Sequence, residues 1–164
     1  MHTSSYEFMY DAVKNHLDTQ TPLKILDVGS LNQNGTYWPI FDIPGWEYHG
    51  LDIAEGDNVD IVVDEEGRWE QIEDGAYDVV ISGQCLEHCE LPWVIAKAME
   101  RVCKVGGIAI IIVPWIFKEH RYPIDCWRML PDGMKAMMTK HCRFETIECT
   151  KGDIDTCFVG RRIE

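Results

Sequence analysis

The chain has 164 residues, of which 46% are hydrophobic and 26% are charged, and its formal net charge is −13. This length predicts one globular domain over residues 1–164, and no apolar run approaches the roughly 20 residues of a membrane span. Between Asp52 and Glu90 there are 13 acidic residues and one basic residue, Arg68. An acidic middle repels phosphate backbones, which argues against sequence-independent nucleic-acid binding.

The seven cysteines are an odd number and are scattered along the chain without a C-x-x-C pair. This pattern predicts free thiols in a reducing cytoplasm rather than a disulfide framework. Residues 1–10 carry neither a basic segment nor an apolar segment of the secretory type, so we expect no signal peptide.

Short apolar runs alternate with longer amphipathic stretches, which is typical of an α/β fold. Helices are expected over residues 4–17, 91–102 and 131–140, with Pro92 in the first turn of the second and the Gly106-Gly107 pair as its terminator and turn. The expected strands are residues 24–28, 47–52, 59–63, 77–82, 108–114, 144–150 and 155–161. The last two flank "KGD" and predict an antiparallel hairpin.

These elements predict a doubly wound, mostly parallel seven-stranded sheet with an antiparallel C-terminal hairpin. Only six residues separate Asp52 from Val59. A parallel crossover usually takes a dozen residues or more, so we expect a shortened connection without a helix between the second and third strands. In such sheets ligands bind at the carboxyl ends of the strands.

Polar residues stand at four of these strand ends. Asp27 lies in "KILDVGSLNQNGTY", Asp52 ends the second strand, Asp64 follows the third, and Ser82 ends the fourth. Asp52 follows Asp27 by 25 positions, close to the spacing at which an acid accepts both ribose hydroxyls of a nucleoside. Asp64 could accept the exocyclic amine of a purine.

The first loop contains no G-x-G-x-x-G sequence, so it offers no cradle for a pyrophosphate. This departure disfavours an NAD(P)-dependent oxidoreductase. A nucleoside with a positive centre and a zwitterionic tail would tolerate Asp27 and an acidic rim, and S-adenosylmethionine has these features.

The segments "ILDVGSLNQNG", "YHGLDI", "YDVVISGQCLEHCELPWVIAKAMERVCKVGG" and "AIIIVP" resemble, in order and spacing, the class I S-adenosylmethionine-dependent methyltransferases. The match covers residues 24–114, and "HRYPIDCWRMLPDG" extends it through Gly133. Its most specific part, "CLEH…L…VCKVGG", looks like the signature of the small-molecule-type branch. The chain departs from the family in two respects. Ser30 and "LNQNG" replace most of the glycine-rich loop, and the connection between Asp52 and Val59 is only six residues long.

The resemblance implies that the residues after the strand ends bind S-adenosylmethionine. Gly29 and its neighbours would line the methionine moiety, Asp52 would hold the ribose and Ile53 would flank the adenine. The implied cofactor-binding residues are Asp27, Gly29, Ser30, Gly35, Asp52, Ile53, Asp64, Glu65, Ser82, Gly83 and Gln84.

Methyl transfer requires an aligned nucleophile in a dry pocket, and an oxygen nucleophile also needs a base. The candidate catalytic residues are His88, after the fourth strand, and His120, Tyr122 and Asp125 in "HRYPIDCWRM". His120 is the candidate base. The alternative is that this segment packs on the sheet and that Arg128 caps a carboxylate.

Cys85, His88, Cys89 and Cys126 could be considered as a zinc site. Structural zinc sites usually show two paired sets of ligands, and the sequence has no second pair. We therefore expect free thiols and no metal.

The sequence predicts a methyltransferase acting on a small-molecule or sugar-like acceptor. The alternative is a non-catalytic adenosyl-binding or interaction module on the same fold. The sequence predicts neither the methylated atom nor the oligomeric state.

Overall fold

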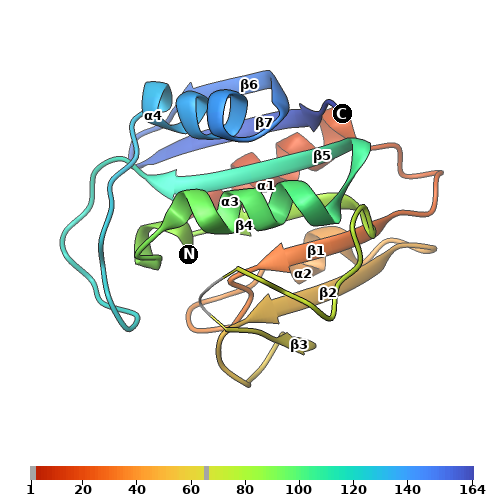
Figure 1. Cartoon of the computed structure of the whole chain (residues 1–164), viewed down its shortest axis with the longest axis horizontal. Coiled ribbons are helices and arrows are strands. Elements are labelled where there is room, and N and C mark those ends of the chain that lie inside the picture. Colours follow the sequence, from red (N-terminus) through yellow and green to blue (C-terminus); the bar gives the residue numbers. More distant parts are fainter. Residues whose placement is uncertain (1–2, 65–66) are drawn as a thin grey trace.

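The computed structural model describes residues 3–64 and 67–164, and these residues form a seven-stranded sheet in the order β3-β2-β1-β4-β5-β7-β6 (Figure 1). The strands from β3 to β5 pair in parallel, and β7 pairs antiparallel with both β5 and β6. The strands are β1 (Lys24–Val28), β2 (Glu47–Asp52), β3 (Ile61–Val62), β4 (Tyr77–Gly83), β5 (Cys103–Pro114), β6 (Phe144–Lys151) and β7 (Asp155–Arg162). This is the doubly wound, mostly parallel seven-stranded sheet with an antiparallel C-terminal hairpin that the sequence predicts.

Helices cover both faces of the sheet (Figure 1). One face is covered by α3 (Pro92–Val102) and α4 (Pro131–Ala136), and the other by α1 (Thr3–His16) and α2 (Trp38–Phe41). The described residues also form two shorter helical turns. They are η1, a 3₁₀ turn (Leu86–His88), and η2, a π-helical turn (Met137–His141) that continues α4.

The two faces have separate hydrophobic cores because successive side chains of a strand point in opposite directions. In β5, Ala109 and Ile111 face the core under α3, whereas Ile110 and Ile112 face the core under α1 and α2. The continuous apolar run in this strand is therefore the mark of a strand buried on both faces.

The connection between β2 and β3 contains no helix, as its length predicts. The strand that follows it is shorter than the predicted 59–63. Asn58 has a left-handed φ of 66°, and the Asp60 carboxylate accepts the Gly50 N–H at 2.8 Å. Regular pairing therefore begins only at Ile61.

The Gly106-Gly107 pair is not a separate turn, contrary to the prediction. Helix α3 ends at Val102, and β5 begins at once with Cys103 beside Tyr77. A register irregularity between Tyr77 and Val79 accommodates the glycines within the strand, and Gly106 has a φ of 83°. Within the described part of the chain, no helix is long and apolar enough to cross a membrane.

The β1 strand lies between β2 and β4. The chain therefore adds β2 and β3 on one side of β1, and then crosses back to add β4 and β5 on the other side. This switch point opens a crevice at the carboxyl ends of the strands. A long connection, the β5–α4 segment (residues 115–130), folds past the same end of the sheet (Figure 1). It contains "HRYPIDCWRM" and has no helix or strand of its own.

Candidate cofactor and acceptor site

A cavity of about 1320 Å³ lies at the carboxyl ends of β1, β2 and β4 and extends to the β5–α4 segment. Ligand pockets for one drug-sized molecule are typically about 300–1,000 Å³. The cavity is thus large enough for a nucleoside cofactor together with a small second molecule.

Most of the predicted cofactor residues line this cavity: Asp27, Gly29, Ser30, Gly35, Asp52, Ile53, Asp64, Gly83 and Gln84. Ser82 is not among the lining residues. Its side chain is buried between strands, where the hydroxyl donates a hydrogen bond to the Val28 carbonyl at 2.9 Å. Glu65, the remaining predicted cofactor residue, lies outside the described residues.

Gly29 is the point at which β1 turns into its loop. Its φ is +80°, which L side chains rarely adopt, and a Cβ at this position would overlap the Cys85 side chain. The loop after β1 therefore lies closer to Cys85, two residues beyond the end of β4, than a side chain at position 29 would allow.

Asp52 supports the backbone of the cavity wall. One carboxylate oxygen accepts the Leu31 N–H at 3.0 Å, and the other accepts the N–H groups of Ile53 at 2.8 Å and Ala54 at 3.3 Å. A carboxylate has about four lone-pair sites, so Asp52 keeps acceptor capacity for a ligand in the cavity.

Asp27 is 4% exposed, and it accepts a short hydrogen bond from the Tyr48 hydroxyl. Burial raises the pKa of its carboxyl to about 7, and the Asp52 charge adds to the increase. A cation placed beside Asp27 would favour the ionised carboxylate and reverse part of this increase.

The charges in this half of the cavity fit S-adenosylmethionine. Asp27, Asp52 and Asp64 line it, and Arg121 is the one Lys or Arg among the described lining residues and belongs to the β5–α4 segment at the other end. A sulfonium and an ammonium group are favoured beside carboxylates, whereas a pyrophosphate is disfavoured.

Aromatic and imidazole rings gather at the other end of the cavity, where His88, His120, Tyr122 and Phe117 line the wall. The His88 ring lies 4.8 Å from the His120 ring and 6.1 Å from the Tyr122 ring, measured between centroids, and both pairs meet edge to face. The structure thus brings together three of the four predicted catalytic residues.

Asp125, the fourth, lies behind this wall rather than in it. Its side chain is 2% exposed, and it accepts hydrogen bonds from Arg128 at 2.6 and 2.8 Å and from the His120 N–H at 2.7 Å. The Arg128 hydrogen bonds hold the pKa of the Asp125 carboxyl well below its usual range. Asp125 is therefore placed to support His120 and is not part of the cavity lining. The alternative role foreseen for Arg128, capping a carboxylate, is present.

The sequence analysis missed Glu87. Its side chain is 0% exposed, and neither carboxylate oxygen has a hydrogen-bond donor among the described residues. Burial raises the Glu87 pKa to about 8. Its backbone carbonyl accepts the N–H groups of Cys126 at 2.7 Å and Trp127 at 3.1 Å, which fastens the β5–α4 segment to η1. The available signal was its place directly before His88 in "CLEH".

Comparisons with known proteins agree with this geometry. The family profile described as "Methyltransferase domain" matches residues 26–111, which is more than half of the chain. A search of curated proteins found no match.

Three solved structures share the fold. An N1-methyltransferase from Burkholderia thailandensis, with bound 1,6-didemethyltoxoflavin and S-adenosylhomocysteine, has a TM-score of 0.75 and 12% identity, covering 98% of this chain and 79% of that chain. A methyltransferase from Aquifex aeolicus has a TM-score of 0.71 and 14% identity, covering 99% and 94%. The cyclase SpnF has a TM-score of 0.74 and 14% identity, covering 98% and 81%.

The fold and the cavity define a class I, Rossmann-like methyltransferase with S-adenosylmethionine as its cofactor. The chain belongs to the methyltransferase-domain family whose profile it matches.

Proposed function

We propose that this protein, as one domain over residues 1–164, transfers the methyl group of S-adenosylmethionine to a small-molecule or sugar-like acceptor. One observation carries the proposal. A single cavity joins an acidic end, suited to a cationic nucleoside, to an end lined by imidazole and phenol groups. The Burkholderia thailandensis structure, which shares this fold, has both 1,6-didemethyltoxoflavin and S-adenosylhomocysteine bound, which supports a small-molecule acceptor.

At the acidic end, the Asp52 carboxylate would accept a ribose hydroxyl with its remaining lone-pair site. Ile53, 43% exposed at the cavity wall, would cover one face of the adenine, and Asp64 would accept the exocyclic amine. The turn at Gly29 and the backbone of Gly83 would border the methionine tail. The neighbouring Asp27 carboxylate would favour its positive charges.

When bound, S-adenosylmethionine supplies a methyl group that is carried by a sulfonium. After the transfer, the sulfur is left as a neutral thioether. The residues of the chain must then hold the nucleophile in line with that methyl group and keep water out. The end of the cavity lined by His88, His120, Tyr122 and Phe117 is called the acceptor end below. Phe117 and Tyr122 provide apolar surface there, and the Tyr122 hydroxyl would orient a polar acceptor. An oxygen acceptor would lose its proton to His120, whose backbone N–H is held by Asp125.

Calorimetric titration with S-adenosylmethionine, S-adenosylhomocysteine and NAD⁺ tests the cofactor part of the proposal. We expect the two adenosyl compounds to bind and NAD⁺ not to bind. Tight binding of NAD⁺ with no binding of the adenosyl compounds would overturn it.

Turnover is tested by incubating the protein with methyl-labelled S-adenosylmethionine and a fractionated metabolite extract, and by following the label into products. The proposal expects a labelled product and formation of S-adenosylhomocysteine, both reduced in an Asp52→Asn variant. Cofactor binding without transfer to any fraction would instead support a non-catalytic adenosyl-binding module.

A further inference from the structure

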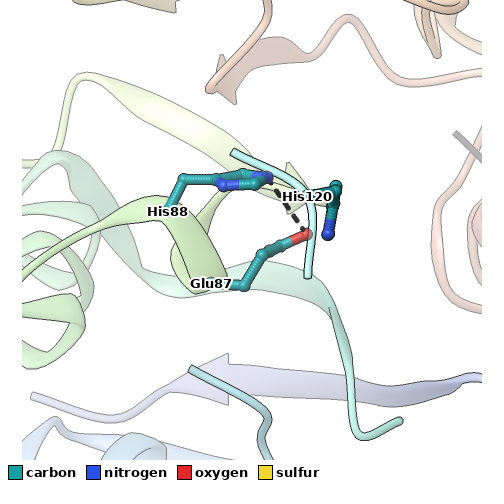
Figure 2. Close-up of side chains that lie close together, drawn as sticks. All are labelled: Glu87, His88 and His120. Atoms are coloured by element: carbon teal, nitrogen blue, oxygen red, sulfur yellow. Dashed lines mark ion pairs between the residues drawn. The ribbon is translucent and has the colours of Figure 1, made fainter. Parts of the chain in front are cut away.

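Three groups that can bind a metal ion converge at the acceptor end of the cavity: Glu87 and His88 on η1, and His120 on the β5–α4 segment (Figure 2). One ligand atom from each side chain lies within 4.8 Å of the others. The Glu87 Oε1 atom is 3.7 Å from His88 Nε2. Neighbouring ligands of one metal ion, each about 2.1 Å from it, are separated by roughly 3–3.5 Å, so small side-chain movements would complete the set.

Both imidazoles are held in the way that metal-binding histidines usually are. His88 Nδ1 is 2.6 Å from the Ile124 carbonyl, and a carbonyl can only accept, so Nδ1 carries the proton and Nε2 has the lone pair. His120 Nδ1 lies 3.3 Å from the Lys118 carbonyl and 3.4 Å from Asp125 Oδ2. A backbone carbonyl or carboxylate behind the ring is the arrangement that orients imidazole ligands toward a metal ion.

Glu87 gives an independent indication of a missing partner. Its carboxylate is fully buried, and neither oxygen has a hydrogen-bond donor among the described residues. Buried carboxylates without a donor are costly, and those that persist are paired with a cation or a metal ion.

We propose that Glu87, His88 and His120 bind one divalent transition-metal ion at the acceptor end of the cavity. Two imidazoles and one carboxylate are a donor set that suits ions such as Zn²⁺, Fe²⁺ and Co²⁺ better than Mg²⁺ or Ca²⁺. Three protein ligands leave a coordination position open, which is the pattern of catalytic rather than structural sites.

The open position would face the cavity, because His88 and His120 are both part of its lining. If the proposed function holds, an acceptor oxygen would bind there, and the ion would lower the pKa of an acceptor hydroxyl. His120 would then be a ligand instead of a base. This role rests on the proposed function, whereas metal binding itself does not.

The set differs from the cysteine-rich zinc site weighed in the sequence analysis. Of its four residues, only His88 belongs to the group that the described residues bring together. The thiols of Cys85, Cys89 and Cys126 provide a competing hypothesis that a spectroscopic probe can separate, because thiolate ligands give Co²⁺ an intense near-ultraviolet charge-transfer band and His/Glu ligands do not.

The test is titration of the untagged, metal-stripped full chain with Co²⁺, followed by absorption spectroscopy and calorimetry. We expect one equivalent to bind without a thiolate band. Affinity should fall at least tenfold in Glu87→Gln and in His120→Ala. The control is His16→Gln, since His16 lies 3.8 Å from Glu148 in a similar His–Glu pair away from the cavity, and it should bind as the parent does.

Absence of stoichiometric binding would overturn the proposal, as would a thiolate band, or equal affinity in His120→Ala and His16→Gln. His120 is partly exposed, so His120→Ala keeps the test decisive even if Glu87→Gln fails to fold. Titration of the same metal-stripped samples with S-adenosylmethionine separates this proposal from the proposed function. Cofactor binding without Co²⁺ binding rejects the metal site alone.

Discussion

Ser30 and Asn58 exchange two hydrogen bonds across the cofactor end of the cavity. The Ser30 hydroxyl donates to the Asn58 carbonyl at 2.7 Å, and the Asn58 side-chain amide donates to the Ser30 carbonyl at 2.9 Å. The same amide also donates to the Tyr48 hydroxyl at 3.2 Å. The short β2–β3 connection therefore fastens a β1 loop that lacks the usual glycines.

Replacing Asn58 should loosen that loop although Asn58 is not part of the cavity lining. Asn58→Gly keeps the left-handed backbone but removes the side-chain amide. We expect the binding free energy of the cofactor to weaken by about 1–2 kcal/mol, which lowers its affinity several-fold or more. Asn58→Ala should cost roughly 1–2 kcal/mol more of unfolding free energy, because alanine is strained at a φ of 66°. Calorimetry and urea unfolding measure both effects. Parent-like affinity in Asn58→Gly would show that the loop holds itself.

Asp52→Asn tests the proposed ribose contact while keeping the shape of the side chain. We expect S-adenosylmethionine to bind more weakly by about 1.5–3 kcal/mol, the scale of losing charge-assisted hydrogen bonds. Asparagine keeps one acceptor oxygen, so it can still hold the N–H groups on one side of the side chain and loses those on the other side. Alanine retains none and would also weaken the wall. Unchanged affinity in a folded Asp52→Asn protein would place the ribose elsewhere.

The sheet was predictable because strand patterns are local. Apolar runs set the positions of β1, β2, β4 and β5, and the six-residue spacing after Asp52 predicted a connection without a helix. The strand ends then indicated which acids would share a cavity. These inferences needed only the two-residue period of a strand and the geometry of parallel sheets.

The support of the site could not be predicted in the same way. Asn58 contacts Ser30 across 28 residues, and the Tyr48 hydroxyl reaches Asp27 across 21. Such pairs depend on the register between strands and on where a connection folds back, and neither leaves a local pattern. The position of Asp125 behind the cavity wall could not be predicted for the same reason, because the sequence does not say which side of its segment faces the cavity.

The pH dependence of stability provides a test of the buried Asp27. Its pKa is about 7 in the folded protein, against an ordinary value of 3.8. Between these values the folded state binds the extra proton, so this contribution to stability is fully present below about pH 4 and is lost as pH rises through about 7. The loss should be on the order of 1–4 kcal/mol. Urea unfolding from pH 4 to 8 measures it.

Asp27→Asn is the matched variant, since its amide oxygen can still accept the Tyr48 hydroxyl. We expect it to flatten this part of the stability profile and to unfold with a higher free energy than the parent at pH 8. An identical slope in both proteins would contradict the assignment to Asp27.

The same carboxylate should make cofactor binding depend on pH. A cationic ligand favours ionised Asp27, so the affinity for S-adenosylmethionine should rise as pH increases from about 6 to 8, by up to roughly tenfold. Tyr48 and Asp52 also face this group, and the Asp27→Asn profile isolates its share. Calorimetry in buffers of different ionisation enthalpy should detect proton release on binding in the parent and not in Asp27→Asn.

The β5–α4 segment should separate into residues that act on the acceptor and residues that hold the segment in place. Arg128 donates to both oxygens of the nearly enclosed Asp125 and, at 3.0 Å, to the Lys118 carbonyl. Arg128→Ala leaves that carboxylate without its main partner and should lower the unfolding free energy by about 1–3 kcal/mol. Arg128 does not line the cavity, so any decrease in cofactor affinity should be indirect and should come from movement of the cavity wall.

Tyr122→Phe should behave in the opposite way. Tyr122 lines the acceptor end and is 51% exposed, so removal of its hydroxyl should leave thermal stability and S-adenosylmethionine affinity within a few-fold of the parent. Turnover on the true acceptor should fall, because in the proposed function the hydroxyl would contact only the acceptor or the transition state. Thermal melts, cofactor titration and turnover on both variants test the division. Parent-like turnover in Tyr122→Phe, together with parent-like stability in Arg128→Ala, would show that neither side chain has the role assigned to it.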